Sequence, residues 1–173
     1  MKKFLLIGAL ILCFVISGCG DSKKTLNITP EDFAKNFNIA LGVVGKQMNT
    51  DYSDLEIVSI EKGKTDNDVT FKQKNYSGGL GGIKEGSNLL TIIFASENNT
   101  NVAGMCLAIP MSVPATREGN MIQQVASKIL GKNRETILKD NGVAITIGQD
   151  SNMTVFMTTT EENLNKGLSE HSK

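Results

Sequence analysis

The sequence predicts an α+β domain in which an antiparallel β-sheet of about six strands carries two main helices on one face. Three observations lead to this fold class. Apolar residues recur at helical spacing in two separate stretches, and other stretches alternate apolar and polar residues as strands do. Short turns join the predicted strands, which favours antiparallel pairing. The chain of 173 residues is long enough for one domain with a buried core.

The first helix is expected to begin at Pro30. Thr29 supplies an N-cap, and Pro30 suits the first helical position. Asp32 takes the position of the capping box where Glu or Gln is usual. Gly42 and Gly45 lie inside the helix, where we expect them to allow a neighbouring backbone to approach closely. The apolar stripe that the helix buries is expected to consist of Phe33, Phe37, Ala40, Leu41, Val44 and Met48.

Four strands are expected in the first two thirds of the chain. Residues 55–61 and 69–74 are predicted to pair as a hairpin across a polar linker. The apolar run at 89–95 suits a central strand that is covered on both faces. The apolar stretch at 102–111 is expected to return beside it as another strand.

The last third is expected to contain a helix pair and two strands. The second main helix is predicted from about Arg117, with Thr116 as its cap and Gly131 as its end. A short helix is expected over 134–139. Alternation then predicts two strands, which contain Val143, Ile145 and Ile147, and Met153, Val155 and Met157.

A glycine-rich segment at 75–88 is the longest irregular stretch expected in the domain, and its composition predicts a flexible loop. A tyrosine among glycines is typical of adaptable binding loops. The alternative is that Tyr76 and Leu80 fold back onto the sheet. The candidate binding residues are Tyr76, Gly78, Gly79, Leu80, Gly81, Gly82 and Ile83.

The N-terminal segment has the composition of a secretory signal peptide. Two lysines follow Met1, an apolar run extends over 4–16, and small residues precede Cys19. The apolar run is shorter than the roughly 20 residues that a membrane-spanning helix needs. A transmembrane helix, or a cleaved signal peptide with an incidental cysteine, are the alternatives.

The sequence Ile16-Ser17-Gly18-Cys19 resembles the lipobox of bacterial lipoproteins. The resemblance implies cleavage before Cys19, diacylglycerol on its thiol and usually a third acyl chain on the new amino group. Because two or three acyl chains anchor a protein stably, we expect the mature protein to sit on a membrane without crossing it. That membrane is the outer membrane, on its periplasmic side, in a Gram-negative cell, or the outer face of the cell membrane in a Gram-positive one.

These features divide the chain into four parts. We expect the signal peptide at 1–18, the lipidated cysteine and a tether at 19–28, the globular α+β domain at 29–159, and a polar, loose or weakly helical tail at 160–173. The precursor carries 18 basic and 18 acidic residues, and removal of the two lysines with the signal peptide leaves a net charge near −2. This balance does not favour nucleic acid as a partner.

The chain has few of the residues that common catalytic sites use. His171 is the only histidine and lies near the C-terminus. Cys13 belongs to the signal peptide and Cys19 to the anchor, so the mature domain retains only Cys106, which an apolar stretch should bury as an inert thiol. We therefore expect no enzymatic activity, no cofactor and no metal site.

The resulting expectation is a membrane-anchored, non-catalytic envelope lipoprotein that binds a protein or an envelope component, for example an inhibitor or immunity-type protein. One alternative is a carrier of a small ligand or lipid, with a cavity between helices and sheet. A hydrolase that uses carboxylates alone is a further alternative without a supporting carboxylate pair. The carrier's cavity would be lined by Met48, Met105, Met111, Met121, Met153 and Met157.

Overall fold

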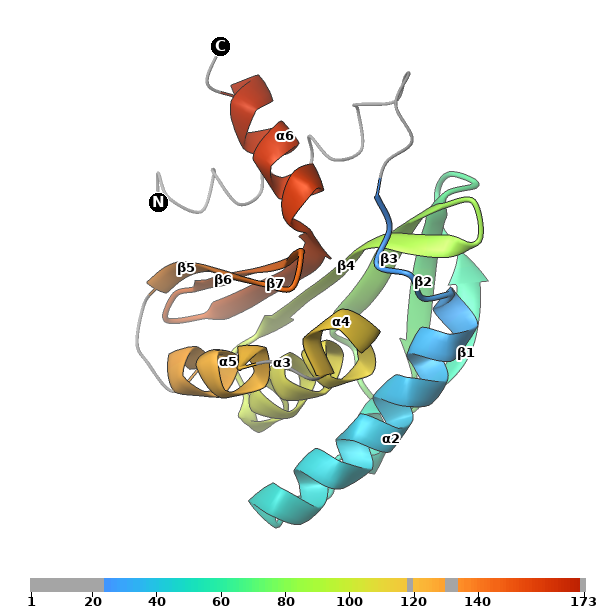
Figure 1. The fold of residues 1–173 in the computed structure, drawn as a ribbon. Coiled ribbons are helices and arrows are strands. Elements are labelled where there is room, and N and C mark those ends of the chain that lie inside the picture. Colours follow the sequence, from blue (N-terminus) through green and yellow to red (C-terminus); the bar gives the residue numbers. More distant parts are fainter. Residues whose placement is uncertain (1–23, 118–119, 130–133, 172–173) are drawn as a thin grey trace.

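The computed structural model describes residues 24–117, 120–129 and 134–171. The predicted signal peptide and Cys19 lie outside these residues. The described residues form one antiparallel sheet of seven strands with helices on both of its faces (Figure 1). The predicted α+β class is confirmed, although there is one strand more than expected and four substantial helices take the place of two.

Helix α2 (Pro30–Met48) begins where the sequence predicts it. The Thr29 hydroxyl accepts a hydrogen bond from the backbone N–H of Asp32 at 3.1 Å and donates one to the Asp32 carboxylate at 3.0 Å. Thr29 and Asp32 therefore cap the helix, although Asp32 stands where a capping box usually has Glu or Gln. Asn49, in the left-handed conformation with φ of 50°, ends the helix, and the 3₁₀ helix η1 (Ser53–Leu55) follows.

Four consecutive strands form the first half of the sheet. They are β1 (Ile57–Lys62), β2 (Asp68–Gln73), β3 (Gly79–Glu85) and β4 (Asn88–Glu97). Each pairs antiparallel with the next one in the chain. The hairpin predicted between the first two strands and the central strand predicted at 89–95 are confirmed.

The strand prediction for 102–111 is wrong, because these residues belong to helix α3 (Thr100–Ser112). Asn99 caps this helix by accepting a hydrogen bond from the N–H of Asn101 at 2.9 Å. The helix is packed between α2, the sheet and α5 (Met121–Ile129), so that most of its residues are buried. A helix that is apolar nearly all round loses the spacing that distinguishes it from a buried strand.

Two details of the following segment also differ from expectation. The second main helix is split into α4 (Pro114–Arg117) and α5. Thr116 lies inside α4 instead of capping a helix, and its buried hydroxyl donates to the carbonyl of Val113 at 3.0 Å.

Strands β5 (Arg134–Asp140), β6 (Val143–Gln149) and β7 (Met153–Thr160) complete the sheet. The short helix predicted at 134–139 is therefore wrong. Asn141 and Gly142, with φ of 50° and 75°, form a two-residue turn between β5 and β6. An Asn-Gly pair between apolar runs is a strong hairpin signal, and it outweighs the weak helical preference of the residues before it.

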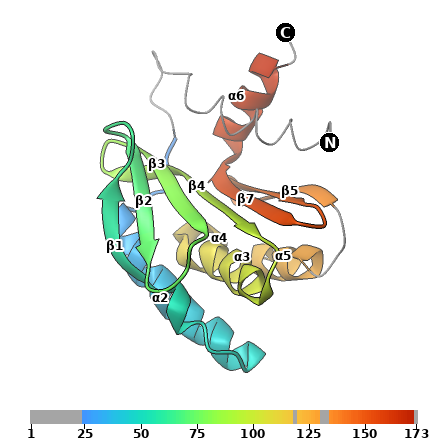
Figure 2. The same cartoon turned by 180° about the vertical axis from the view of Figure 1, so that it is seen from behind.

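The pairing of β4 with β7 joins the two halves of the sheet, whose strand order is β1-β2-β3-β4-β7-β6-β5. Phe94 of β4 lies opposite Phe156 of β7, and both side chains are fully buried. Figure 2 shows the first four strands in front of α2 and α3, which cover the far side of the sheet in that view. The main core therefore lies between the sheet and the layer of α2, α3 and α5.

The opposite face of the sheet carries α6 (Glu161–His171), in the region where we expected a polar tail (Figure 1). Leu164 is fully buried in a second, smaller cluster with Ala144 and Met157. One apolar side of an otherwise polar helix is enough to attach it to the sheet. The described domain therefore includes the segment that begins at Glu161.

Two glycines allow α2 and α3 to approach the buried ring of Tyr52. A Cβ atom at Gly104 of α3 would lie 2.8 Å from that ring. At Gly45 of α2 a Cβ atom would lie 2.7 Å from the backbone oxygen of Thr50, so the predicted close approach is confirmed there. The predicted close approach is wrong for Gly42, because a Cβ atom there would have no neighbour within 4 Å.

We therefore predict opposite effects for two matched substitutions. Gly104→Ala should lower the free energy of unfolding by up to about 2 kcal/mol, because overpacking costs roughly 1–3 kcal/mol and the gain in helix propensity returns about 1 kcal/mol. Gly42→Ala should raise it by up to about 1 kcal/mol. Urea unfolding followed by circular dichroism measures both, and equal effects of the two substitutions would contradict the packing around Tyr52.

Candidate functional site

The glycine-rich segment that the sequence suggested as a flexible binding loop is largely strand β3. Gly81 lies opposite Thr70 of β2 and Ile93 of β4, so this strand is paired on both sides. A Cβ atom at Gly82 would lie 2.9 Å from the backbone oxygen of Thr91. The glycines therefore allow close packing, and the prediction of a flexible loop is wrong for residues 79–85.

Tyr76 and Leu80 fold back onto the sheet, as the alternative interpretation held. The Tyr76 ring is stacked against Phe94 with 6.5 Å between centroids, and its hydroxyl hydrogen-bonds with the Oγ of Ser96. Gly78 leaves room for this ring, since a Cβ atom there would overlap it. Leu80 is only 2% exposed.

Ile83 lies on the other face of the sheet from Leu80. It packs beside the small cluster under α6, together with Ile93 and Leu168. Gly79 and Gly81 alternate with Leu80 along β3 and so share the face of Ile83. The candidate residues are thus divided between two faces and do not form one site.

The ionisable groups with displaced pKa values have structural roles. Burial raises the pKa of the Cys106 thiol, which disfavours the reactive thiolate. Hydrogen bonds from the backbone of Ser53 lower the pKa of Asp51, and those from Asn152 and Met153 lower the pKa of Asp150. Within residues 24–117, 120–129 and 134–171, no three His, Cys, Asp or Glu residues gather as metal ligands would.

The methionines proposed to line a ligand cavity are dispersed. Met105 and Met121 are fully buried in the main core, and Met157 is buried on the opposite face of the sheet. Met48 and Met153 are exposed by about 40%. Met48 therefore does not belong to the buried stripe of α2. The distribution favours core filling over a shared pocket.

The described chain begins with a segment that is fastened to the sheet. Leu26 and Ile28 are 3% and 4% exposed. The backbone N–H of Leu26 donates to the carbonyl of Leu89 in β4, and the N–H of Leu89 donates to the carbonyl of Ile28, both at 2.8 Å. Residues expected to be a tether are therefore, from Lys24 onward, part of the folded domain.

Helix α6 holds the same segment from its other side. The side-chain amide of Asn163, itself buried, donates to the backbone carbonyl of Lys24 at 2.8 Å. The Lys24 ammonium lies 2.8 Å from the carboxylate of Glu162, which raises the pKa of the lysine. We call residues 24–28 together with Leu89, Glu162 and Asn163 the N-terminal clamp.

A cleft of about 900 Å³ opens beside the N-terminal clamp. Its walls come from the clamp, the β5–β6 turn and the first turn of α6, and they are mixed in polarity. The residues that line it include Lys24, Leu26, Asn141, Val143, Glu161 and Asn165.

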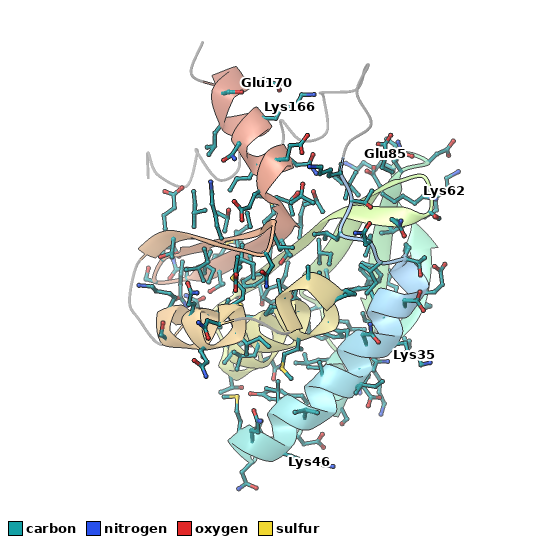
Figure 3. The ribbon with its side chains drawn as sticks, in the orientation of Figure 1. Lys35, Lys46, Lys62, Glu85, Lys166 and Glu170 are labelled. Carbon is teal, nitrogen blue, oxygen red and sulfur yellow. The ribbon has the colours of Figure 1, made fainter. Side chains whose placement is uncertain are left out.

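A second feature lies on the outward side of α2. Ile39 and Val43 are 59% and 39% exposed, and Gly42 beside them has no neighbour within 4 Å of its missing side chain. Lys35 and Lys46 bound this patch and extend outward from the helix (Figure 3); neither forms an ion pair with a residue that the structure describes. We call these five residues the α2 stripe.

The α2 stripe lies on a helix that is held in place. Asn38, next to Ile39, donates its amide N–H to the carbonyl of Ile57 at 3.0 Å and accepts a hydrogen bond from the N–H of Ile57 at 2.8 Å. The side chain thereby binds the start of edge strand β1. A cleft of about 370 Å³ continues from the stripe, with Gly42 and Lys46 among its lining residues.

Sequence reasoning missed both features, for different reasons. The α2 stripe was detectable, because Ile39 and Val43 are apolar, four residues apart and outside the predicted buried stripe. The N-terminal clamp was not, because Asn163 and Lys24 lie far apart in the chain. A contact of that kind has no local sequence pattern.

No protein-family model, curated protein or solved structure matches this chain. Among the described residues, no helix is both long and apolar enough to cross a membrane.

We predict a pH-dependent role for Asp150 in the β6–β7 turn. Its carboxylate accepts backbone hydrogen bonds at 2.7 and 2.8 Å, so its pKa in the folded state lies below the ordinary value of 3.8. A carboxyl group whose pKa is lowered by folding stabilises the fold at pH values above its ordinary pKa. This contribution is lost as the pH falls through the folded-state pKa. Asp150→Asn should therefore be less stable than the parent at neutral pH, with the difference shrinking below about pH 4. Urea unfolding across this range measures it, and a pH-independent difference would refute the role.

Proposed function

We propose that this protein is a membrane-anchored, non-catalytic lipoprotein of the bacterial cell envelope that binds a protein partner through the α2 stripe. The lipobox-like sequence before Cys19 supports the anchor. The observation that carries the binding proposal is the exposed pair Ile39 and Val43, because apolar side chains gathered on a rigid helix favour an interaction site.

Most large exposed apolar side chains of the described residues lie on or beside α2. Ile39, Val43 and Met48 belong to the helix, and Val58 follows the β1 residue that Asn38 binds. An apolar centre with charged residues at its rim is the usual anatomy of a protein interface. The cleft at the end of α2 adds a concave surface to the convex helix.

The charges of the α2 stripe specify the chemistry of the partner. Lys35 and Lys46 are 11 positions apart, or about 16 Å along a helix. A complementary partner presents apolar side chains to Ile39 and Val43 and carboxylates to the two lysines. Gly42 between them lets the partner backbone approach closely, since nothing fills the space of its absent side chain.

The apolar contact alone supports only modest affinity. Full burial of an aliphatic side chain contributes about 1.5–3 kcal/mol, and both residues are already partly covered. A lipid anchor on the same membrane as the partner would raise the effective concentration and compensate for weak contacts. The anchor and the stripe therefore act together in this proposal.

We predict that a photo-crosslinking residue at Val43 captures a discrete protein in intact cells, and that Ile39→Glu abolishes the product. Ile137→Glu is the matched control, because Ile137 is also exposed, at 42%, but lies on edge strand β5. Combined Lys35→Glu and Lys46→Glu should weaken capture at least about tenfold, as expected for losing charge complementarity.

Equal capture with Ile39→Glu and Ile137→Glu would refute the α2 stripe as the binding surface.

The anchor is tested separately with Cys19→Ser. That variant should lose both acylation and cleavage of the signal peptide, and processing and membrane sedimentation that match the parent would refute the lipoprotein part of the proposal.

A further inference from the structure

We infer that the N-terminal clamp fixes the orientation of the domain on the bilayer, with α6 facing the lipid surface and the C-terminal end of α2 facing away from it. This inference rests on the proposed acylation of Cys19. It adds a membrane-facing surface to the protein, which the lipid anchor alone does not specify.

The first step is that the segment from Cys19 to Lys24, which we call the link, is short. Five residue steps separate Cys19 from Lys24, where the clamp begins. A fully extended chain covers at most about 3.3–3.6 Å per residue, so the acylated cysteine lies within about 18 Å of Lys24 in any conformation. The domain therefore cannot move far from the membrane.

The second step is that the chain leaves the domain at a fixed point. Lys24 is held through its backbone by Asn163, and its exposed side chain forms an ion pair with Glu162. Two residues later, the buried Leu26 is hydrogen-bonded to β4. Lengthening the link by releasing this segment would expose apolar side chains and break these bonds, so the clamp keeps the link short.

The third step is the arrangement of the elements around that point. Figures 1 and 2 both show residues 24–28 on the side of the molecule that carries α6, with α2 running away from it. Helix α2 has 19 residues and is therefore about 28 Å long. Its end at Met48, with the adjoining cleft, lies at the opposite side of the domain from α6.

The surface around α6 has no strong charge of one sign. Helix α6 carries Lys166 together with Glu161, Glu162 and Glu170, and Lys62 and Glu85 end strands β1 and β3 (Figure 3). Binding to anionic lipid requires clusters of basic residues, which this mixture does not provide. The orientation therefore comes from the acyl chains and the clamp, and it should be the same on anionic and zwitterionic bilayers.

Energy transfer from the acylated, full mature protein to acceptor headgroups in vesicles tests this inference. A fluorophore is placed at Lys166→Cys on α6 or at Gln47→Cys on α2, both exposed positions. The native Cys106 is buried and should not react. Transfer should be several-fold greater from position 166 than from position 47, on phosphatidylcholine vesicles with or without phosphatidylglycerol.

An insertion after Asp21 provides the matched variant, because it lengthens the link and leaves the described domain unchanged. A Gly/Ser insert of about 10 residues raises the root-mean-square span of the link from roughly 12 Å to roughly 21 Å, and it should bring the two transfer signals close to each other. Equal transfer from both positions in the parent, or an unchanged difference after insertion, would overturn the inference alone. Failure of the acylated chain to bind vesicles would overturn the lipoprotein proposal as well.

Discussion

Strand β4 is the constraint on which the rest of the structure depends. It pairs with β3 on one side and with β7 on the other, and thereby joins two halves that are separated by three helices. Its register places Phe94 opposite Phe156 beneath the helix layer, where both rings are fully buried. At its start, Leu89 binds the backbone of Leu26 and Ile28. The same strand thus organises the core and holds the point at which the chain enters the domain.

The two surfaces that matter for the proposed function lie at opposite ends of this framework. The N-terminal clamp joins the entering chain to β4 and α6, and in the proposed lipoprotein the short link to Cys19 would keep this end near the bilayer. The exposed Ile39 and Val43 lie on α2, which runs away from the clamp (Figure 1). A partner in the aqueous compartment would reach them without competing with lipid. In this account the lipid anchor supplies the location and the fold supplies the orientation.

The sequence was informative where structure is determined locally. The cap at Thr29 and the alternating strands were predicted correctly, because turn chemistry and periodicity act over a few residues. Helix α3 was mistaken for a strand because burial on nearly every side removes its periodicity. Strand β3 was mistaken for a loop because glycines also fit between closely packed strands. The contact of Asn163 with Lys24 depends on the whole topology, so no local pattern reports it.

Amide hydrogen exchange of the protein tests the central claim most directly, namely that the folded domain begins at the clamp. The amide protons of Leu26 and Leu89 are both donated to backbone carbonyls within the clamp. The account predicts that they exchange nearly as slowly as the amide of Ile93, which lies in the middle of β4 between paired strands. Exchange of Leu26 at the rate of an unstructured peptide, with Ile93 still protected, would contradict it.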